Sequence, residues 1–232
     1  MTVYDILSGQ GINDDICKKL QKYYELLIEW NQKINLTAIT DPQDVAQKHF
    51  IDCMEIFKSG VIYDGASVID VGTGAGFPGL VMKICNPTLD VTLMDSLNKR
   101  INFLNEVADT LDVSVNCVHS RAEDAGRNKL YREKFDICAS RAVANLATLS
   151  ELCLPFVKVG GYLAALKGPK AEEEIEAAKN AIKLLGGQIE NVIKYKIADT
   201  DYDHNIVLVK KISAISSVYP RKAPKPSKEP LK

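Results

Sequence analysis

The sequence predicts an α/β fold in which a mostly parallel, seven-stranded sheet with one antiparallel strand follows an N-terminal helical extension. Three observations support this prediction. The first 60 residues carry apolar side chains at helical spacing. From about residue 61, short apolar segments alternate with amphipathic ones, as in repeated β-α units. The last two apolar segments have no helix between them, which predicts an antiparallel strand at that end of the sheet.

The N-terminal extension, residues 1–60, is expected to be helical. Apolar side chains at steps of three and four form one stripe along its first long helix: Ile16, Leu20, Tyr23, Leu27, Trp30 and Ile34. Asn13 or Asp14 is suited to cap this helix. A second helix is expected to begin after Pro42, because proline is tolerated in a first turn, and to end near Phe57.

The sheet domain is expected to span residues 61–213. Strands are expected at 67–71, 91–95, 115–119, 135–140, 161–166, 189–196 and 206–212. Helices are expected at 78–85, 97–111, 143–154 and 171–185. Because crossover helices cover a parallel sheet on both faces, its strands should be buried.

The remaining residues, 214–232, form a tail rich in Pro and Lys. It has few apolar side chains to bury, so we expect an extended, basic arm. From its charge alone, a disordered, solubilising end is favoured.

Composition limits the class of protein. A chain of 232 residues with 46% hydrophobic and 25% charged residues can bury one sizeable core without disulfides. Its six cysteines form no C-x-x-C pair and most lie in apolar segments, which favours free, buried thiols in a reducing cytoplasm. The start of the chain lacks the order of a signal peptide, and no apolar run is long enough to span a membrane. The net charge of −1 argues against wholesale electrostatic binding of nucleic acid but permits a local basic patch.

The most informative motif follows the first predicted strand. Residues 68–79 read V-I-D-V-G-T-G-A-G-F-P-G, with three alternating glycines after Asp70. Glycine lets the backbone adopt positive φ and approach a ligand closely. From Gly72 the dinucleotide pattern G-x-G-x-x-G fails at Phe77, whereas from Gly74 it fits. The acid-x-Gly-x-Gly-x-Gly series resembles motif I of the S-adenosylmethionine (SAM) methyltransferases, where an acid suits a ligand with an ammonium group. A glycine-rich turn without a ligand is the alternative.

Residues after the other strands complete the candidate site, because ligands of open α/β sheets bind at the carboxyl ends of the strands. Asp95 could accept hydrogen bonds from ribose hydroxyls, or it could cap the following helix. The backbone and carboxylate of Ala122-Glu123 could bind adenine, or the segment could be a surface turn with solvated charges.

Arg141 is unusual, since a cation here directly follows an apolar strand. It could hold the methionyl carboxylate or a substrate phosphate, which makes it the one candidate for a catalytic role, or it could form a structural ion pair. Lys167 is a weaker candidate for a phosphate contact. The three histidines lack metal-ligand spacing, so no metal site is expected, and no Ser-His-Asp or Cys-His set is evident.

Taken together, these motifs resemble the bacterial 16S rRNA guanine-N7 methyltransferases called RsmG, formerly glucose-inhibited division protein B. The likeness covers nearly the whole chain. It rests on segments 30–37, 49–52, 70–79, 95–100, 140–142, 167–168 and 219–222. Two features depart from the family pattern. Cys53 stands in place of serine, and the tail reads K-A-P-K-P from Lys222, with Glu229 further on, where the family more often has K-A-G-T-P and a lysine.

The resemblance implies a Rossmann-like class I methyltransferase that transfers a methyl group from SAM to N7 of a guanine in a conserved loop of 16S rRNA. It implies SAM binding by Gly72, Phe77, Ala122, Glu123 and Arg141. The residues themselves add Asp70 and Gly74 from the glycine motif and Asp95 after the second predicted strand. Candidate RNA contacts are Lys99, Arg100, Lys167, Arg221 and Lys222. The expected partner is 16S rRNA or the small ribosomal subunit, and we expect a cytoplasmic monomer.

Two other classes of function remain open at this point. A NAD(P)-dependent oxidoreductase fits the glycine pattern that starts at Gly74. A non-catalytic RNA-binding module fits the basic tail.

Overall fold

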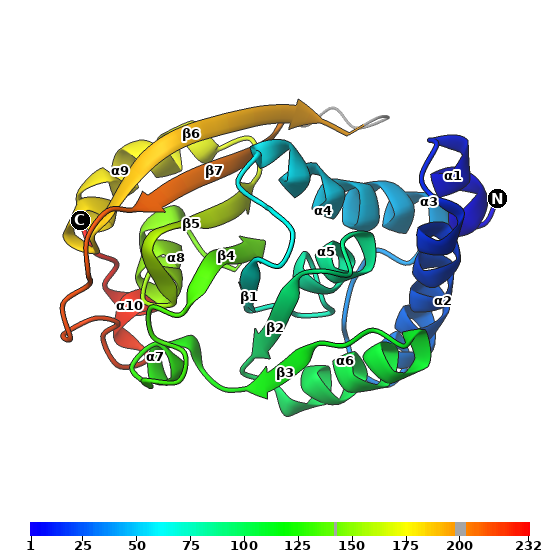
Figure 1. Ribbon diagram of the computed structural model, residues 1–232, viewed down its shortest axis with the longest axis horizontal. Helices are drawn as coiled ribbons and strands as arrows, with labels where there is room; N and C mark the ends of the chain where they lie inside the picture. The colour runs from blue at the N-terminus through cyan, green and yellow to red at the C-terminus, as the bar shows by residue number, and fades with distance from the viewer. Residues whose placement is uncertain (142, 198–202) are drawn as a thin grey trace.

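A computed structural model describes residues 1–141, 143–197 and 203–232. Its centre is a seven-stranded sheet with the strand order β3-β2-β1-β4-β5-β7-β6. β7 pairs antiparallel with both of its neighbours, whereas β1 to β5 pair with one another in parallel. The prediction of one antiparallel strand is therefore confirmed, and Figure 1 shows β6 and β7 together at one edge.

The strands agree closely with the prediction. They are β1 Ser67–Val71, β2 Asp90–Asp95, β3 Asn116–His119, β4 Phe135–Arg141, β5 Val157–Lys167, β6 Gly187–Lys196 and β7 Asp203–Lys211. The helices of the sheet domain are α5 Gly79–Cys85, α6 Asn98–Leu111, α7 Ala122–Ala125, α8 Leu146–Cys153 and α9 Ala171–Leu184. α8 begins three residues later than expected, because Asn145 caps it by accepting a hydrogen bond from the Thr148 amide. Ala142, part of the segment 140–142 quoted above, lies outside the described residues.

Side chains on opposite faces of the sheet belong to two separate apolar cores. On β1, Val68 packs with the N-terminal helices, α5 and α6, whereas its neighbour Ile69 packs with α8 and α9. This alternation follows from the period of two along a strand. The sheet is thus covered on both faces, as predicted for parallel β-α units.

The N-terminal extension packs as helices against the first of these cores (Figure 1). It comprises α1 Val3–Gly9, α2 Asp14–Asn31 and a continuous helical segment made of α3 Pro42–Val45, the π-helix η1 Ala46–Ile51, α4 Asp52–Met54 and the 3-10 helix η2 Glu55–Ser59. Asn13 caps α2 as expected. Ile34 was predicted to belong to this helix but lies beyond its end, although it still packs on the core.

The prediction of an extended C-terminal arm with little to bury is wrong. Ile215, Pro220 and Pro226 are buried, and the tail ends in a short helix, α10 Lys225–Lys228. Figure 1 shows this segment beside α7 and α8. The compositional argument failed because a few spaced residues are enough to dock the tail: Ile215 belongs to the apolar core, Pro220 and Pro226 are buried, and Arg221 pairs with Glu151.

Two further findings concern the whole chain. All six cysteines are free, and four of them are buried. Among the described residues, no helix is both long enough and apolar enough to cross a bilayer.

Candidate cofactor site

A cavity of about 470 Å³ opens at the carboxyl ends of β1, β2 and β4, where the topology predicts a ligand. Seven of the eight predicted cofactor residues line it: Gly72, Gly74, Phe77, Asp95, Ala122, Glu123 and Arg141. The positions after the strand ends therefore predicted a cluster of residues that lie up to 69 positions apart in the sequence (from 72 to 141) and line one cavity in the structure.

Gly72 sits where no side chain fits. Its φ is +71°, and a Cβ there would lie 2.8 Å from Cγ2 of Val143. Its amide and that of Thr73 both donate to the Met94 carbonyl, at 2.9 and 3.0 Å, which holds the loop against β2. The bare backbone of the loop consequently forms the floor of the cavity.

Asp70 is the predicted cofactor residue that does not line the cavity. It is fully buried beneath the loop, where Oδ2 accepts hydrogen bonds from Thr73 Oγ1 at 2.7 Å and from the Gly79 amide at 2.8 Å. Its Oδ1 is buried without a hydrogen-bond partner among the described residues. Burial raises the pKa of this carboxyl group to about 6. Asp70 therefore shapes the loop from behind instead of facing the ligand.

Asp95 combines the two roles that the sequence left open. Oδ1 accepts from the Leu97 amide at 2.9 Å, at the start of α6. Oδ2 accepts from the Gly74 amide at 3.0 Å and from Arg100 Nη1 at 3.2 Å. The buried carboxylate thus ties the glycine loop to α6 while it also lines the cavity. A carboxylate has acceptor capacity beyond these three bonds, so it can still receive hydroxyl donors.

The end of the cavity at α7 is formed by Ala122 and Glu123. Glu123 is largely buried as a residue and lines the cavity. A carboxylate on a cavity wall can accept a hydrogen bond from a donor on a ligand. The amino group of a purine would supply one.

Arg141 is held in place by the N-terminal extension. Its Nη1 donates to Asp52 Oδ2 at 2.9 Å and to the Lys48 carbonyl at 3.0 Å, and its Nη2 donates to His49 Nδ1 at 3.1 Å. Its guanidinium carbon lies 4.9 Å from the centre of the Phe77 ring, on which His49 also stacks. The structural ion pair considered from the sequence is therefore present, in a side chain that lines the cavity.

His49 and Asp52 are site residues that reasoning from single residues missed. Burial and the charge of Arg141 lower the pKa of His49 to about 4, so the ring is neutral at pH 7 and Nδ1 can accept from Arg141. Asp52 Oδ1 accepts from the Tyr195 hydroxyl at 2.7 Å and lies 3.1 Å from His204 Nδ1. The segment 49–52 was noticed only through the family resemblance, because the sequence does not show that this helix reaches β4.

Arg141, His49 and Val143 also border a second cavity of about 580 Å³. It lies on the side of β5 and β7 and includes Asn145, Lys167 and His204. The two cavities therefore share a wall at Arg141. A cofactor in the first and an acceptor in the second would meet there.

The predicted RNA contacts differ in their availability. Lys99 and Lys222 are exposed. Arg100 forms an ion pair with Asp95, and Lys167 is buried with its amine 2.8 Å from a carboxylate oxygen of Glu174. Arg221 pairs with the fully buried Glu151. No group of three or more His, Cys, Asp or Glu suited to a metal ion was found among the described residues.

The cavity fits SAM better than a dinucleotide. A pyrophosphate needs free amides at the start of the helix after the glycines. Here the first amide of α5, that of Gly79, donates to Asp70, whose negative charge would oppose a phosphate. The acceptors Asp95 and Glu123 instead suit the ribose and the adenine of a nucleoside without a pyrophosphate. Fold and site together define a class I SAM-dependent methyltransferase.

Comparisons with known proteins identify the family. The family GidB, rRNA small subunit methyltransferase G, matches residues 16–204. The chain is 52% identical over 221 residues to a ribosomal RNA small subunit methyltransferase G of Clostridium botulinum, covering 95% of this chain and 92% of that one. It is 52% identical over 225 residues to the protein of the same name from Clostridium perfringens, with 97% and 94% covered. The chain belongs to the rRNA small subunit methyltransferase G family and is a SAM-dependent enzyme.

Solved structures agree on the fold. A methyltransferase from Pyrococcus furiosus aligns with a TM-score of 0.56 at 18% identity, covering 83% of this chain and 98% of that one. TrmN from Thermus thermophilus aligns with a TM-score of 0.55 at 18% identity over 71% of this chain, which spans 53% of the TrmN chain. TYW2 from M. jannaschii, solved in complex with AdoMet, aligns with a TM-score of 0.52 at 14% identity, covering 69% of this chain and 76% of that one.

Proposed function

We propose that this protein transfers a methyl group from SAM to N7 of a guanine in a conserved loop of 16S rRNA. The 52% identity to ribosomal RNA small subunit methyltransferases over nearly the whole chain carries this proposal. The choice of N7 rests on the resemblance to the RsmG family. We further propose that it acts as a monomer in the cytoplasm, on 16S rRNA or the small subunit.

The residues that would hold SAM lie around the first cavity. Asp95 would accept the ribose hydroxyls, and the Ala122-Glu123 segment would receive adenine. The backbone at Gly72 and Gly74 would face the amino-acid part of the ligand. When bound, SAM supplies an electrophilic methyl group on its sulfonium.

Catalysis in this proposal needs no general base, because guanine N7 already carries a free lone pair. The protein's task is then to align the base with the methyl carbon, and orientation alone can lower a barrier by about 7–11 kcal/mol. The shared wall of the two cavities supports this, since Phe77, His49 and Arg141 are packed on one another there. A wall with several mutual contacts can hold an unstacked loop base in one orientation.

Exposed lysines would position the RNA through its phosphates. Lys99 lines a groove of about 510 Å³ together with Arg100 and residues 33–35, next to the cofactor cavity. Lys222 and Lys225 are exposed on the tail. Such contacts add affinity without reading the sequence of the RNA.

Mass mapping of the methylated nucleotide tests the proposal. Small subunits that lack the modification are incubated with labelled SAM, and the labelled position is located in 16S rRNA. A single labelled guanine is expected, and replacing that guanine with 7-deazaguanosine should abolish labelling. Label on another atom or another RNA would overturn the proposal.

Titration of the protein with SAM and, separately, with NADH distinguishes the alternative cofactor. We expect heat of binding with SAM only. A non-catalytic RNA-binding module would bind the rRNA and leave it unlabelled.

A further inference from the structure

The C-terminal segment, residues 215–231, is fastened to the body of the protein by a buried ion pair. We call this segment the C-terminal strap. Arg221 donates from Nε to Glu151 Oε1 at 2.8 Å and from Nη2 to Oε2 at 2.6 Å, and its backbone amide donates to Oε1 at 2.8 Å. Glu151 is fully buried on α8, and Arg221 supplies the hydrogen bonds that its two carboxylate oxygens accept.

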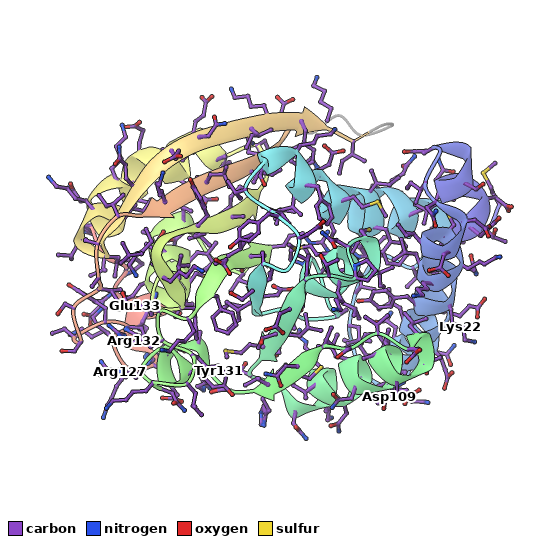
Figure 2. All side chains as sticks on the ribbon, in the orientation of Figure 1. Lys22, Asp109, Arg127, Tyr131, Arg132 and Glu133 are labelled. Carbon is purple, nitrogen blue, oxygen red and sulfur yellow. The ribbon has the colours of Figure 1, made fainter. Side chains whose placement is uncertain are left out.

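A second arginine joins the strap to the end of α7. Arg132 Nη1 donates both to the Gly126 carbonyl, at 2.9 Å, and to the Tyr219 carbonyl, at 2.8 Å. Its Nη2 donates to the carbonyls of Ile215 and Ser216, at 2.9 and 3.0 Å. Figure 2 shows Arg132 and Arg127 together at the end of the molecule where the strap lies. One guanidinium therefore fixes the strap and the α7 segment relative to each other.

The strap also packs directly behind α7. Pro220 is buried, and a Cβ added at Gly126 would lie 3.1 Å from its Cγ. Arg127 Nε donates to the Pro220 carbonyl at 2.9 Å. Close packing and the hydrogen bond leave α7 little room to move away from the cavity.

Both elements held by the strap contribute to the cofactor cavity. α7 carries Ala122 and Glu123, and α8 carries Leu152, next to Glu151. We propose that Arg221 and Arg132 are positioning residues for SAM: through Glu151 and the Gly126 carbonyl they hold the purine end of the cavity in its binding shape. They touch neither SAM nor RNA in this proposal.

Binding of Arg221 to an RNA phosphate is the competing interpretation, and the contacts oppose it. Nε and Nη2 of Arg221 already donate to Glu151 and to the Glu229 carbonyl, so a phosphate could use these donors only by drawing Arg221 from Glu151, which would leave a carboxylate buried without its partner. Lys222, the next residue, is exposed and needs no such exchange. The strap thus turns Arg221 inward and Lys222 outward.

Arg221→Gln, in the full-length protein, tests the role. We expect SAM affinity, measured by titration calorimetry, to fall by about fivefold or more. The KM for SAM should rise while kcat at saturating SAM changes little, and the salt dependence of RNA binding should stay as in the wild type. Lys228→Gln is the matched control, because it removes an exposed charge from the same segment and should leave SAM affinity unchanged.

Hydrogen exchange distinguishes positioning from general destabilisation. In Arg221→Gln without ligand, amides of residues 122–126 should exchange faster, whereas those of α6 should not change. If this variant does not fold, Arg221→Lys, which keeps the charge but loses the two-pronged contact, should show the same pattern to a smaller degree.

A folded Arg221→Gln variant with wild-type SAM affinity would overturn the inference, as would a flattened salt dependence of RNA binding. The inference rests on the proposed function only through SAM. Failure of the wild type to bind SAM would refute the proposed function, whereas equal binding by wild type and variant would refute the positioning role alone.

Discussion

The two extensions of the sheet domain serve the cofactor cavity in different ways. The N-terminal extension forms part of its wall: His49 lines the cavity, and Asp52 and Lys48 hold Arg141. The C-terminal strap lines none of it and instead fastens α7 and α8 from behind. The difference shows that a side chain can support a site either by lining the cavity or by holding the elements that line it. Substitutions of the two kinds of residue should therefore have different effects on stability and on SAM binding.

The largest expected effect follows from Asp52→Ala in the N-terminal extension. This change leaves the buried Arg141 guanidinium without its carboxylate, so the free energy of unfolding should fall by about 3–5 kcal/mol. Chemical denaturation measures it. Asp14→Ala is the control, because Asp14 pairs with Lys18 at the surface and should cost less than about 1 kcal/mol. If both variants lose the same small amount of unfolding free energy, Asp52 does not stabilise the cavity wall through its ion pair with Arg141.

Gly72→Val should weaken SAM binding by about 100-fold, or about 2.7 kcal/mol, because the new side chain would collide with Val143 and displace the loop. Gly60→Val is the matched control: its φ of +70° is nearly the same, but no atom lies within 4 Å of the added Cβ. Both variants carry the strain of positive φ, and only the first should lose SAM in a titration. Normal SAM binding by folded Gly72→Val would contradict the assignment of the glycine loop to the cofactor site.

His49→Gln should remove part of the acid sensitivity of the protein. The pKa of His49 is lowered to about 4 in the folded state, so between pH 6.5 and 4 the unfolded chain binds a proton that the folded chain does not. Stability is therefore lost as pH falls through this window, by about 2 kcal/mol between pH 7 and 4.5. Asp70, with a pKa raised to about 6, has the opposite slope but is common to both proteins.

Urea denaturation of wild type and His49→Gln across this pH range isolates the histidine. The wild type should lose more stability on acidification than the variant. Parallel profiles would show that the pKa of His49 is not lowered in the folded protein, which would contradict the effect of burial and of the Arg141 charge on this ring.

The smallest expected effect is on RNA binding through the outer face of the strap. Lys222→Gln and Lys225→Gln should each reduce the slope of log affinity against log salt by about 0.7–0.9 if each lysine contacts one phosphate. SAM affinity is expected to stay the same. Filter binding of a 16S rRNA hairpin across a salt series measures the slope. An unaltered slope would remove this face from the RNA site and leave the strap with its inward role alone.

Local patterns in the sequence were sufficient to predict most of the helices and strands of the fold. The limits of β1 are as predicted, and Asn13 caps α2, because alternation and capping act between near neighbours. The cavity residues after each strand were also found, since the topology alone places them at one edge. Asp70 was misplaced because the motif shows an acid beside glycines but not on which side of the loop its carboxylate lies.

What the sequence otherwise missed or left open involves contacts between distant residues. Arg221 binds Glu151, which lies 70 positions earlier in the sequence, and the residues around them do not predict this pair. Arg141 meets Asp52 across 89 positions in the same way. While the partner of a charged residue is unknown, the residue is expected to be solvated or to bind a ligand. For this reason the tail was predicted to be an extended, basic arm.

The order in which a ribosome makes the chain gives the strap one more consequence. Every residue that lines the cofactor cavity is synthesised before residue 215. Domains begin to fold during synthesis from the N-terminal side. A nascent chain can therefore build its sheet and its glycine loop early, yet in our proposal the purine end of the cavity is secured only after residues 215–231 have emerged. Methyl-donor binding of full strength should then require that synthesis has passed this segment.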